Sequence, residues 1–274
     1  MNSITIDALN LYYRELNFKI KEAVRKEGIK KVIIKNARGQ RFIGTGLKEK
    51  DVEIIIESGV PGNDLAMFMD GPTVKVFGNA QDGVGNTMNN GKVFIHGDAG
   101  DVICYGMRNG KIFIKGNVGY RVGIHMKEYK DMIPSIVVGG KAGDFFGEYM
   151  AGGIGVVLGL NNDDKPIVGR YCATGMHGGV IYIRTEKVPT YLGKEVKVFE
   201  LNESDKEKLK SLIEEFCQEF KEYKAEDILK SRFIKLIPVS KRPYGRLYSP
   251  GNHFPLPEEN YFSNKKIDIE KKYY

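Results

Sequence analysis

The amino-acid sequence predicts a mainly β fold: a right-handed parallel β-helix of about six to seven coils, with an N-terminal αβ cap and a C-terminal helix plus extended tail. Three observations lead to this fold class. Glycines recur every nineteen residues, methionines follow them at the same period, and a short alternating apolar segment precedes most of the glycines. Glycine makes up 33 of the 274 residues, about 12%, against roughly 7% in an average protein.

The period runs through the middle of the chain. Its first marker is a glycine at positions 59, 78, 97 and 116, and its second is a methionine ten residues later, at positions 69, 88, 107 and 126. A fixed period of this length is typical of solenoids, in which each repeat forms one coil that stacks on the next. Met150 and Met176 continue the column after longer insertions. We expect these methionines to fill the core rather than to bind a metal.

The segments before these glycines are predicted to be strands, because aliphatic residues alternate with other side chains in VKVFG, VFIHG and IFIKG. Stacking one strand per coil predicts a buried aliphatic ladder made of Val76, Ile95, Ile114, Val137 and Val157. A coil corner needs either a positive φ or space that a Cβ would fill, so it favours glycine. The predicted corner glycines are Gly59, Gly78, Gly97, Gly116, Gly139 and Gly159.

The repeat is less regular at its ends. The first copy, VEIIIESG at 52–59, places Glu57 where the later copies have Val or Ile, as expected for an end coil. SIVVGG at 135–140, IGVVLG at 154–159 and VIYIR at 180–184 supply further strands, and residues 160–171 are expected to form a loop. We therefore divide the chain into an αβ cap at 1–50, the β-helix at 51–190, and a C-terminal helix and tail at 191–274.

Both ends of the β-helix are expected to be covered, because an open end would expose the core and unpaired backbone. Residues 6–27 have near-helical apolar spacing, and the apolar strand KKVIIKN follows them. On the C-terminal side, Ser204 and Glu207 form a capping-box pattern before an amphipathic stretch that continues to about Lys224.

The segment at 233–250 contains three prolines and is expected to be extended. It could lie along the β-helix of its own chain or along a partner protein. Its aromatic and basic residues are typical of interface anchors. Tyr244, Arg246 and Tyr248 are therefore the candidate partner contacts.

Composition and motifs argue against several function classes. The net charge of +7 is compatible with a nucleic-acid partner, but the basic residues are scattered and no nucleic-acid-binding motif is present. The chain has no signal-peptide pattern and no run of about eighteen apolar residues, so we expect a cytoplasmic protein without membrane association. Glycine doublets such as GVG at 83–85 precede no helix pattern, which argues against a dinucleotide site.

The cysteines give no sign of a cluster or a disulfide framework. Cys104, Cys172 and Cys217 are odd in number and far apart, and no CxxC pair is present. Cys217 falls in the C-terminal helix pattern, where a half-buried thiol is the expected state. We therefore expect no zinc or iron–sulfur centre held by this chain alone.

The repeat region resembles a known family. The block GNAQDGVGNTMNNGKVFIHGDAGD and the segment GDFFGEYMAGGIGVVLG at 143–159 are similar to the GXGXG domain at the C-terminus of the glutamate synthase large subunit. The resemblance covers about residues 52–185. The same domain type also forms one of the subunits of formylmethanofuran dehydrogenase, so the family is better defined than the complex to which the chain belongs.

The resemblance implies a non-catalytic scaffolding subunit that docks an amidotransferase and an FMN-dependent synthase during glutamate biosynthesis. FMN and an iron–sulfur cluster are then expected on the partner subunits, and none in this chain. The alternative is the equivalent scaffold in a formylmethanofuran dehydrogenase or a related molybdenum or tungsten complex. The sequence assigns no catalytic, cofactor-binding or metal-binding residue, and it leaves self-association open.

A third hypothesis is an independent enzyme that uses the β-helix as a platform. Its candidate side chains are His96, His125, Asp98, Asp101, Asp144 and Glu148. The alternative for the carboxylates is that they are solvated turn residues. A pocket that brought Glu148 close to His177, with shifted pKa values, would favour the enzyme.

Overall fold

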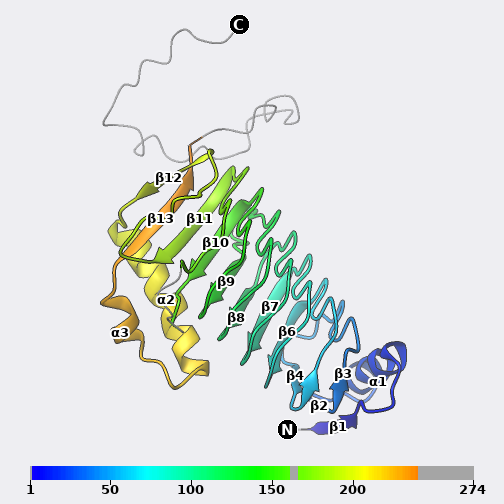
Figure 1. Ribbon diagram of the computed structural model, residues 1–274. Helices are drawn as coiled ribbons and strands as arrows, with labels where there is room; N and C mark the ends of the chain where they lie inside the picture. Colours follow the sequence, from blue (N-terminus) through cyan, green and yellow to red (C-terminus); the bar gives the residue numbers. More distant parts are fainter. Residues whose placement is uncertain (1, 161–165, 240–274) are drawn as a thin grey trace, which may run out of the picture. The chain divides into compact units, whose positions relative to one another are not determined.

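The computed structural model describes residues 2–160 and 166–239, and it contains one large sheet that is folded into stacked coils (Figure 1). The strands are β1 (Ser3–Asp7), β2 (Lys31–Lys35), β3 (Ala37–Arg38), β4 (Glu53–Ile56), β5 (Gly59–Val60), β6 (Asp70–Val76), β7 (Asn90–Ile95), β8 (Lys111–Ile114), β9 (Ser135–Val138), β10 (Ala151–Val157), β11 (Gly178–Arg184), β12 (Val196–Phe199) and β13 (Phe233–Pro238). The helices are α1 (Tyr13–Arg25), α2 (Glu203–Glu219) and α3 (Ala225–Leu229). None of the helices within these residues is long and apolar enough to cross a membrane.

The main sheet has the order β1-β2-β4-β6-β7-β8-β9-β10-β11-β13-β12. All neighbours from β1 to β11 are parallel, and only β13 and β12 at the far end pair antiparallel. Successive parallel strands come from successive coils, so the predicted parallel β-helix is confirmed, with about seven turns. The segment at 1–50 contributes β1 and β2 to this same sheet.

Each coil has a second and a third side besides its strand in the main sheet. The second side is a column of single bridges that links small residues of successive coils, namely Ala80, Ala99, Val118, Ala142 and Val168. The third side is a tight curl in which alternate residues have positive φ. In the coil at 83–87 these are Gly83 at 72°, Gly85 at 70° and Thr87 at 53°.

The interior of the coils is apolar and fully buried. It contains the aliphatic side chains of the strands, the bridge column and the methionine column, including Met88 and Met107, each 0% exposed. The register places Val76, Ile95 and Ile114 opposite one another, then Val138 and Val157. All five lie in this interior core.

The predicted ladder is wrong at one strand. Val137 pairs with Phe113 and Val156 and points to the outer face of the sheet, while Val138 occupies the inward position. The same one-residue shift affects Gly139, which stacks on Lys115, whereas Gly140 bonds to Gly116. The insertion between Met126 and β9 breaks the nineteen-residue count, and a shift by one residue moves a side chain to the other face.

The strand of the first coil, β4, also pairs with β6 in a register that differs from the one read from the repeat in the sequence. Ile56 pairs with Val76, so Glu57 follows the strand and is exposed instead of standing at an inward position. The interval from Ile56 to Val76 is twenty residues, one more than the interval between the glycines. The irregularity at Glu57 is therefore one extra residue between the end of β4 and Gly59, and it lies outside the ladder.

Corner glycines fulfil two different needs. Gly59 and Gly159 have positive φ, at 86° and 57°. Gly97 and Gly116 have ordinary φ but no room for a side chain, because a Cβ there would lie 2.1 Å from Oδ1 of Asn79 and 2.2 Å from Oδ1 of Asp98, respectively. Gly78 has neither constraint, since the nearest atom to its Cβ position is 3.6 Å away.

The side chains that occupy this space tie each coil to the next. Oδ1 of Asn79 accepts a hydrogen bond from the backbone N–H of Asp98 at 2.9 Å, and Oδ1 of Asp98 accepts one from Asn117 at 2.6 Å. Asn117 repeats the contact to Lys141 at 2.9 Å. An Asn or Asp that follows a corner glycine thus lies over the glycine of the next coil and fixes the stacking register.

The N-terminal helix is shorter than predicted. Residues 6–27 were expected to be helical, but β1 occupies Ser3–Asp7 and α1 spans Tyr13–Arg25. Ile6 belongs to the strand because it pairs with Ile34 of β2. The inner side of α1, with Leu16, Ile20, Ala23 and Val24, is buried against the interior core, so α1 covers the first end of the stack.

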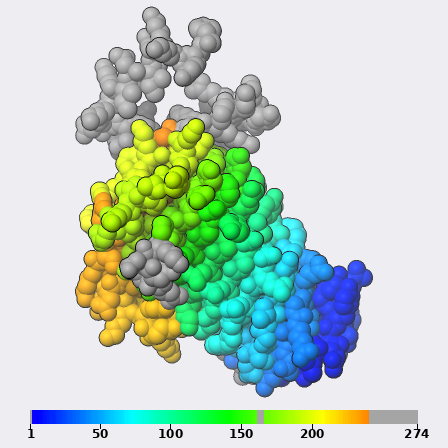
Figure 2. Space-filling view, viewed as in Figure 1, coloured from blue at the N-terminus to red at the C-terminus, as the bar shows by residue number. Residues whose placement is uncertain are grey.

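The C-terminal helices pack on the outer face of the sheet and form a second apolar cluster. Leu212, Phe216 and Phe220 lie against outward-facing residues of β7 to β11, among them Phe94 and Phe113, whose rings stack at 5.1 Å. In Figure 2 the orange residues lie beside the green coils and away from the blue N-terminal end. Residues 233–238, expected to be loop-like, form β13 between β11 and β12.

The capping box of α2 lies two residues before the predicted one. The side chain of Asn202 accepts from the N–H of Asp205, and the carboxylate of Asp205 accepts from the N–H of Asn202, both at 2.9 Å. The prediction from Ser204 and Glu207 was wrong because α2 begins at Glu203, so Ser204 lies inside the helix. Asp205 has a further role. Its buried carboxylate also binds Nζ of Lys235 on β13 and the hydroxyl of Tyr182 on β11.

We predict that Gly97→Ala destabilises the protein by about 2 kcal/mol, because the added Cβ would also lie 2.8 Å from the backbone carbon of Gly78, which cannot move freely. Gly78→Ala is the matched control and should change stability by less than about 0.5 kcal/mol. Equilibrium urea unfolding of both variants measures the difference. Equal stability of the two variants would contradict the stacking role of the corner glycines.

We predict that Asp205→Asn destabilises the protein by about 3 kcal/mol, because it leaves Lys235 buried without its carboxylate. Burial acts to raise the pKa of Asp205, but hydrogen bonds from Lys235, Asn202 and Tyr182 outweigh it and hold that pKa below its usual value. The stabilisation is therefore present above the unfolded-state pKa of about 3.9 and is lost as the pH falls through the folded-state pKa.

The measurement is the free energy of unfolding as a function of pH for the wild type and for Asp205→Asn. The double variant Asp205→Asn/Lys235→Met is the control, because it also removes the buried cation that the Asp205 carboxylate balances and should recover part of the loss. An unchanged pH dependence in Asp205→Asn would show that this network does not anchor α2.

Candidate partner interface

Outward side chains of the positive-φ curls form rows along one side of the coils, which we call the aromatic edge. Its members are Tyr105, Tyr120, Arg121, His125, Phe145, Tyr149, Arg170, Tyr171 and Tyr191. Each curl repeats at the same place in its coil, so residues of successive coils lie one above another. Five tyrosines of this edge are between 43% and 64% exposed.

The first row of the aromatic edge begins with the side chain of an arginine. The guanidinium of Arg121 lies 5.1 Å from the ring centre of Phe145, and the ring of Phe145 stacks on Tyr171 at 5.1 Å. Arg170 lies 6.0 Å from the ring of Tyr191, which belongs to the next coil. Such rows combine aromatic and cation–π contacts and remain accessible to solvent.

The second row is centred on a histidine. The ring of His125 contacts Tyr105 edge-on at 5.9 Å and stacks on Tyr149 at 5.5 Å. The row ends at Gly175, where a Cβ would lie 2.3 Å from the ring of Tyr149. His125 therefore has a structural position in an exposed aromatic stack.

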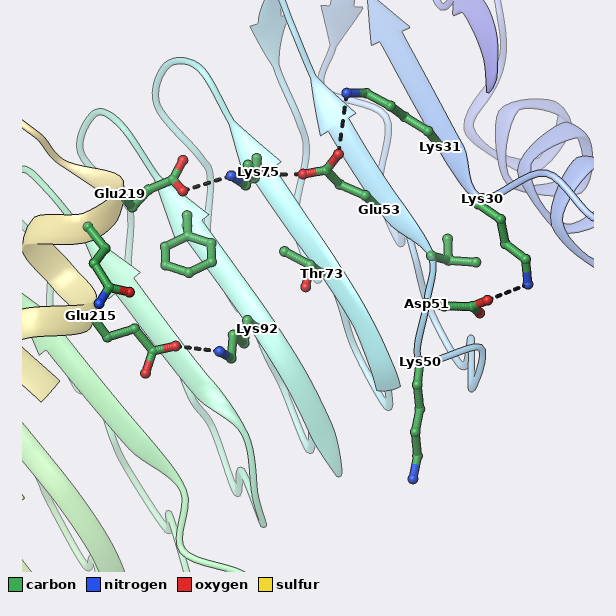
Figure 3. A pocket seen from close by; sticks show the side chains of 13 residues that line it. Lys30, Lys31, Lys50, Asp51, Glu53, Thr73, Lys75, Lys92, Glu215 and Glu219 are labelled. Atoms are coloured by element: carbon green, nitrogen blue, oxygen red, sulfur yellow. Dashed lines mark hydrogen bonds and ion pairs between the residues drawn. The ribbon is translucent and has the colours of Figure 1, made fainter. Parts of the chain in front are cut away.

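A pocket of about 480 Å³ lies on the other side of the coils, where the outer face of the sheet meets α2 (Figure 3). Its lysines face carboxylates. Nζ of Lys75 lies 2.7 Å from Glu219 and 3.8 Å from Glu53, and Nζ of Lys92 lies 2.6 Å from Glu215. Because Lys75 and Lys92 on the sheet bind Glu219 and Glu215 on α2, these ion pairs help to hold α2 on the sheet.

The ion pairs lower the pKa of a glutamate on α2. Burial acts to raise the pKa of Glu215, but hydrogen bonds from Lys111 and Lys92 outweigh it and lower that pKa. His96 joins this group, since its Nε2 lies 3.0 Å from Oε1 of Glu219 and its ring contacts Phe220. The structure thus places His96 under α2 and His125 on the aromatic edge.

The turn carboxylates proposed for an enzyme are engaged in coil stacking. Asp98 accepts its hydrogen bond from the next coil, at Asn117. Oδ1 of Asp101 accepts from the N–H of Tyr120, and Oδ1 of Asp144 accepts from the N–H of Arg170, both at 2.7 Å. Each of these carboxylates therefore has a structural role, which is to link its coil to the next one.

Glu148 and His177, whose proximity would favour the enzyme hypothesis, each contact a different residue. The buried carboxylate of Glu148 lies 3.4 Å from Nη1 of Arg121 in the preceding coil, and Nδ1 of His177 lies 3.0 Å from the carbonyl oxygen of Gly175. Within residues 2–160 and 166–239, no three His, Cys, Asp or Glu side chains gather closely enough to hold a metal ion. The expected partner contacts Tyr244, Arg246 and Tyr248 lie outside the described residues.

The aromatic edge was not predicted from the sequence. A signal was available: His125 and Tyr149 each come one residue before a methionine of the repeat, and Tyr105 comes two residues before one. Counting from the methionine column would have aligned His125 with Tyr149 and placed Tyr105 one residue earlier in its coil.

Comparison with known proteins defines the class. The family model described as the GXGXG motif matches residues 12–239, so the chain belongs to the GXGXG motif family. It is 54% identical over 256 residues to an uncharacterized protein of Methanocaldococcus jannaschii, covering 91% of this chain and 98% of that one. These matches extend over the coils and over α2.

One further sequence relative and one solved structure have named functions. The large chain of NADPH glutamate synthase from Bacillus subtilis is 37% identical over 115 residues, which are 38% of this chain but only 7% of the relative. A chain of the formyltransferase/hydrolase complex of Methylorubrum extorquens, solved with methylofuran, superposes with a TM-score of 0.57. That match covers 83% of this chain and 91% of the other at 18% identity, and it shows the shared fold alone.

We predict that thiol reagents label the native protein slowly. Burial raises the pKa of Cys104 well above its usual value, that of Cys172 to about 12 and that of Cys217 to about 11, so little thiolate exists near neutral pH. Labelling by iodoacetamide, followed by mass spectrometry, should be slow in native buffer and fast in urea. Fast native labelling of Cys172 would contradict its burial.

Proposed function

We propose that this protein is a non-catalytic scaffolding subunit of a glutamate synthase-type complex, where it docks an amidotransferase and an FMN-dependent synthase. The observation that carries the proposal is the aromatic edge, a row of exposed Tyr, Phe and Arg side chains on a rigid stack of coils. These residue types dominate the energetics of protein–protein contacts. An exposed patch of large aromatic side chains on a folded domain marks an interaction site.

The engaged side chains of the repeat support a structural role. Asp98, Asp101 and Asp144 hold neighbouring coils, while Glu148 pairs with Arg121. A β-helix built in this way is stiff along its stack, because every coil is bonded to the next through backbone and side chains. Stiffness of this kind suits a subunit that keeps two catalytic bodies at a fixed separation.

The glutamate synthase proposal rests on the 37% identity to part of the Bacillus subtilis large chain. It places FMN and an iron–sulfur cluster on the partner subunits and leaves this chain without either. It also places the protein in the cytoplasm, in glutamate biosynthesis.

A second candidate is the equivalent scaffold of a formylmethanofuran dehydrogenase or a related molybdenum or tungsten complex. It is favoured by the superposition on a chain of the Methylorubrum extorquens complex, which covers 83% of this chain and 91% of the other. The two candidates share a scaffolding role and differ in the partner.

The experiment is purification of the full chain at native abundance with identification of its partners. A flavin-containing synthase subunit should be recovered, and the isolated chain should be colourless and without glutaminase activity. The double variant Tyr149→Ala/Tyr171→Ala removes two rings of the aromatic edge and should weaken partner binding by about 2 kcal/mol, roughly thirtyfold.

The matched control is Tyr129→Ala, which removes an exposed ring from the insertion before β9. It should leave partner binding unchanged. Equal binding by the double variant and the wild type would remove the aromatic edge from the proposal. Recovery of molybdenum or tungsten subunits in place of the flavoprotein would replace the first candidate by the second.

A further inference from the structure

The strand β1 forms one edge of the main sheet. It pairs in parallel with β2 from Ser3 opposite Lys31 to Asp7 opposite Lys35. Among residues 2–160 and 166–239, no strand pairs with its other side. Ser3, Thr5 and Asp7 are exposed to solvent.

The hydrogen bonds show which backbone groups point away from β2. The N–H of Ala8 donates to the carbonyl of Lys35, and the carbonyl of Asn2 accepts from Lys31. Residues that bond to one neighbour alternate along a strand, so the even-numbered residues of β1 face β2. The N–H and C=O groups of Ser3, Thr5 and Asp7 therefore face outward.

This edge lacks the features that usually prevent strand addition. Natural edge strands carry Pro, Lys or a bulge, and β1 has none of them. Its one charged side chain, Asp7, is bent back to accept hydrogen bonds from the N–H of Leu9 and the side chain of Asn36, both at 3.0 Å. At the opposite edge of the sheet, β12 carries the exposed Lys197.

The sequence of β1 is self-complementary. Ile4-Thr5-Ile6 reads the same in both directions, so two antiparallel copies centred on Thr5 place Ile4 opposite Ile6 and Ser3 opposite Asp7. In this register the outward-facing residues of both copies meet, and each opposed pair can exchange two backbone hydrogen bonds. The two Asp7 carboxylates lie at opposite ends and do not face each other.

Large apolar side chains are exposed at the same end of the stack. Leu9, which follows β1, is 38% exposed, and Tyr12 and Phe18 at the start and on the outer side of α1 are 62% and 59% exposed. Figure 1 shows β1 and α1 together at the N-terminal end of the coils, far from β12 and β13. An apolar end surface beside a free strand edge offers the contact area that strand pairing alone would lack.

We propose that two copies of this chain associate through antiparallel pairing of β1 with β1 about a two-fold axis at Thr5. The pairing joins the main sheets of the two copies into one continuous sheet. The N-terminal ends then meet, and the aromatic edge of each copy stays open for the partner of the proposed function. The dimer does not depend on which partner that is.

The first experiment measures the mass of the full chain by light scattering after gel filtration. The wild type should have twice the chain mass of 30.8 kDa. Thr5→Pro removes an outward N–H without touching the bonds to β2, and it should be monomeric. Thr5→Val keeps the N–H and the strand propensity, so it should remain dimeric.

The second experiment tests the register by oxidation. Residues opposed across the axis have Cα atoms about 5.5 Å apart, within disulfide range, so Thr5→Cys should form an inter-chain disulfide. Ser3→Cys is the matched control, because its cysteines would be separated by roughly four residues of strand, about 13 Å, and should not form one. The native cysteines are buried or half-buried and give little background.

The proposal is overturned by a wild type that is monomeric, by a folded Thr5→Pro that stays dimeric, or by equal cross-linking of Ser3→Cys and Thr5→Cys. Should Thr5→Pro fail to fold, the two cysteine variants decide alone. A monomeric chain whose Thr5 becomes protected from solvent exchange only in the partner complex would assign the β1 edge to a strand of another protein, and would also overturn it.

Discussion

The structure depends on the contact between an Asn or Asp side chain and the corner glycine of the next coil. The side chain takes the space that a Cβ would need and accepts a backbone hydrogen bond from the residue after the glycine, as Asn79 does above Gly97. A parallel ladder by itself allows strands to slide, because its backbone bonds are alike at every register. The repeated Asx contact selects one register, so the aliphatic ladder and the methionine column line up in the interior.

Alignment of the coils also orders what lies outside them. Outward residues of β7 to β11 form a continuous apolar strip, which Phe216 of α2 and Phe220 just after it cover. Lysines beside the strip pair with Glu215 and Glu219. The buried pair of Asp205 and Lys235 then links α2 to β13, which is held between β11 and β12. The same alignment stacks Tyr105, His125 and Tyr149 into an exposed row, so one constraint produces both the covered face and the open edge.

This architecture gives structural roles to the carboxylates and histidines that were candidates for catalysis. The carboxylates at the turns accept backbone hydrogen bonds. Of the described histidines, His125 lies in an aromatic stack, His96 lies against Glu219 and His177 lies beside a backbone carbonyl. The two proposed contact surfaces, the aromatic edge and the outward side of β1, lie at different places on the coils.

The sequence by itself determined the parallel β-helix, the strands and most of the inward ladder, because the period and the alternation of apolar residues are local. It did not determine the register across insertions, so Val137 was placed in the core where Val138 lies, nor the start of α1, since Ile6 gains more from pairing with Ile34 than from a helix. The pairing of β13 and the contacts of the aromatic edge were decided by the tertiary structure, because each brings together segments that are distant in the sequence and become neighbours only when the stack has formed.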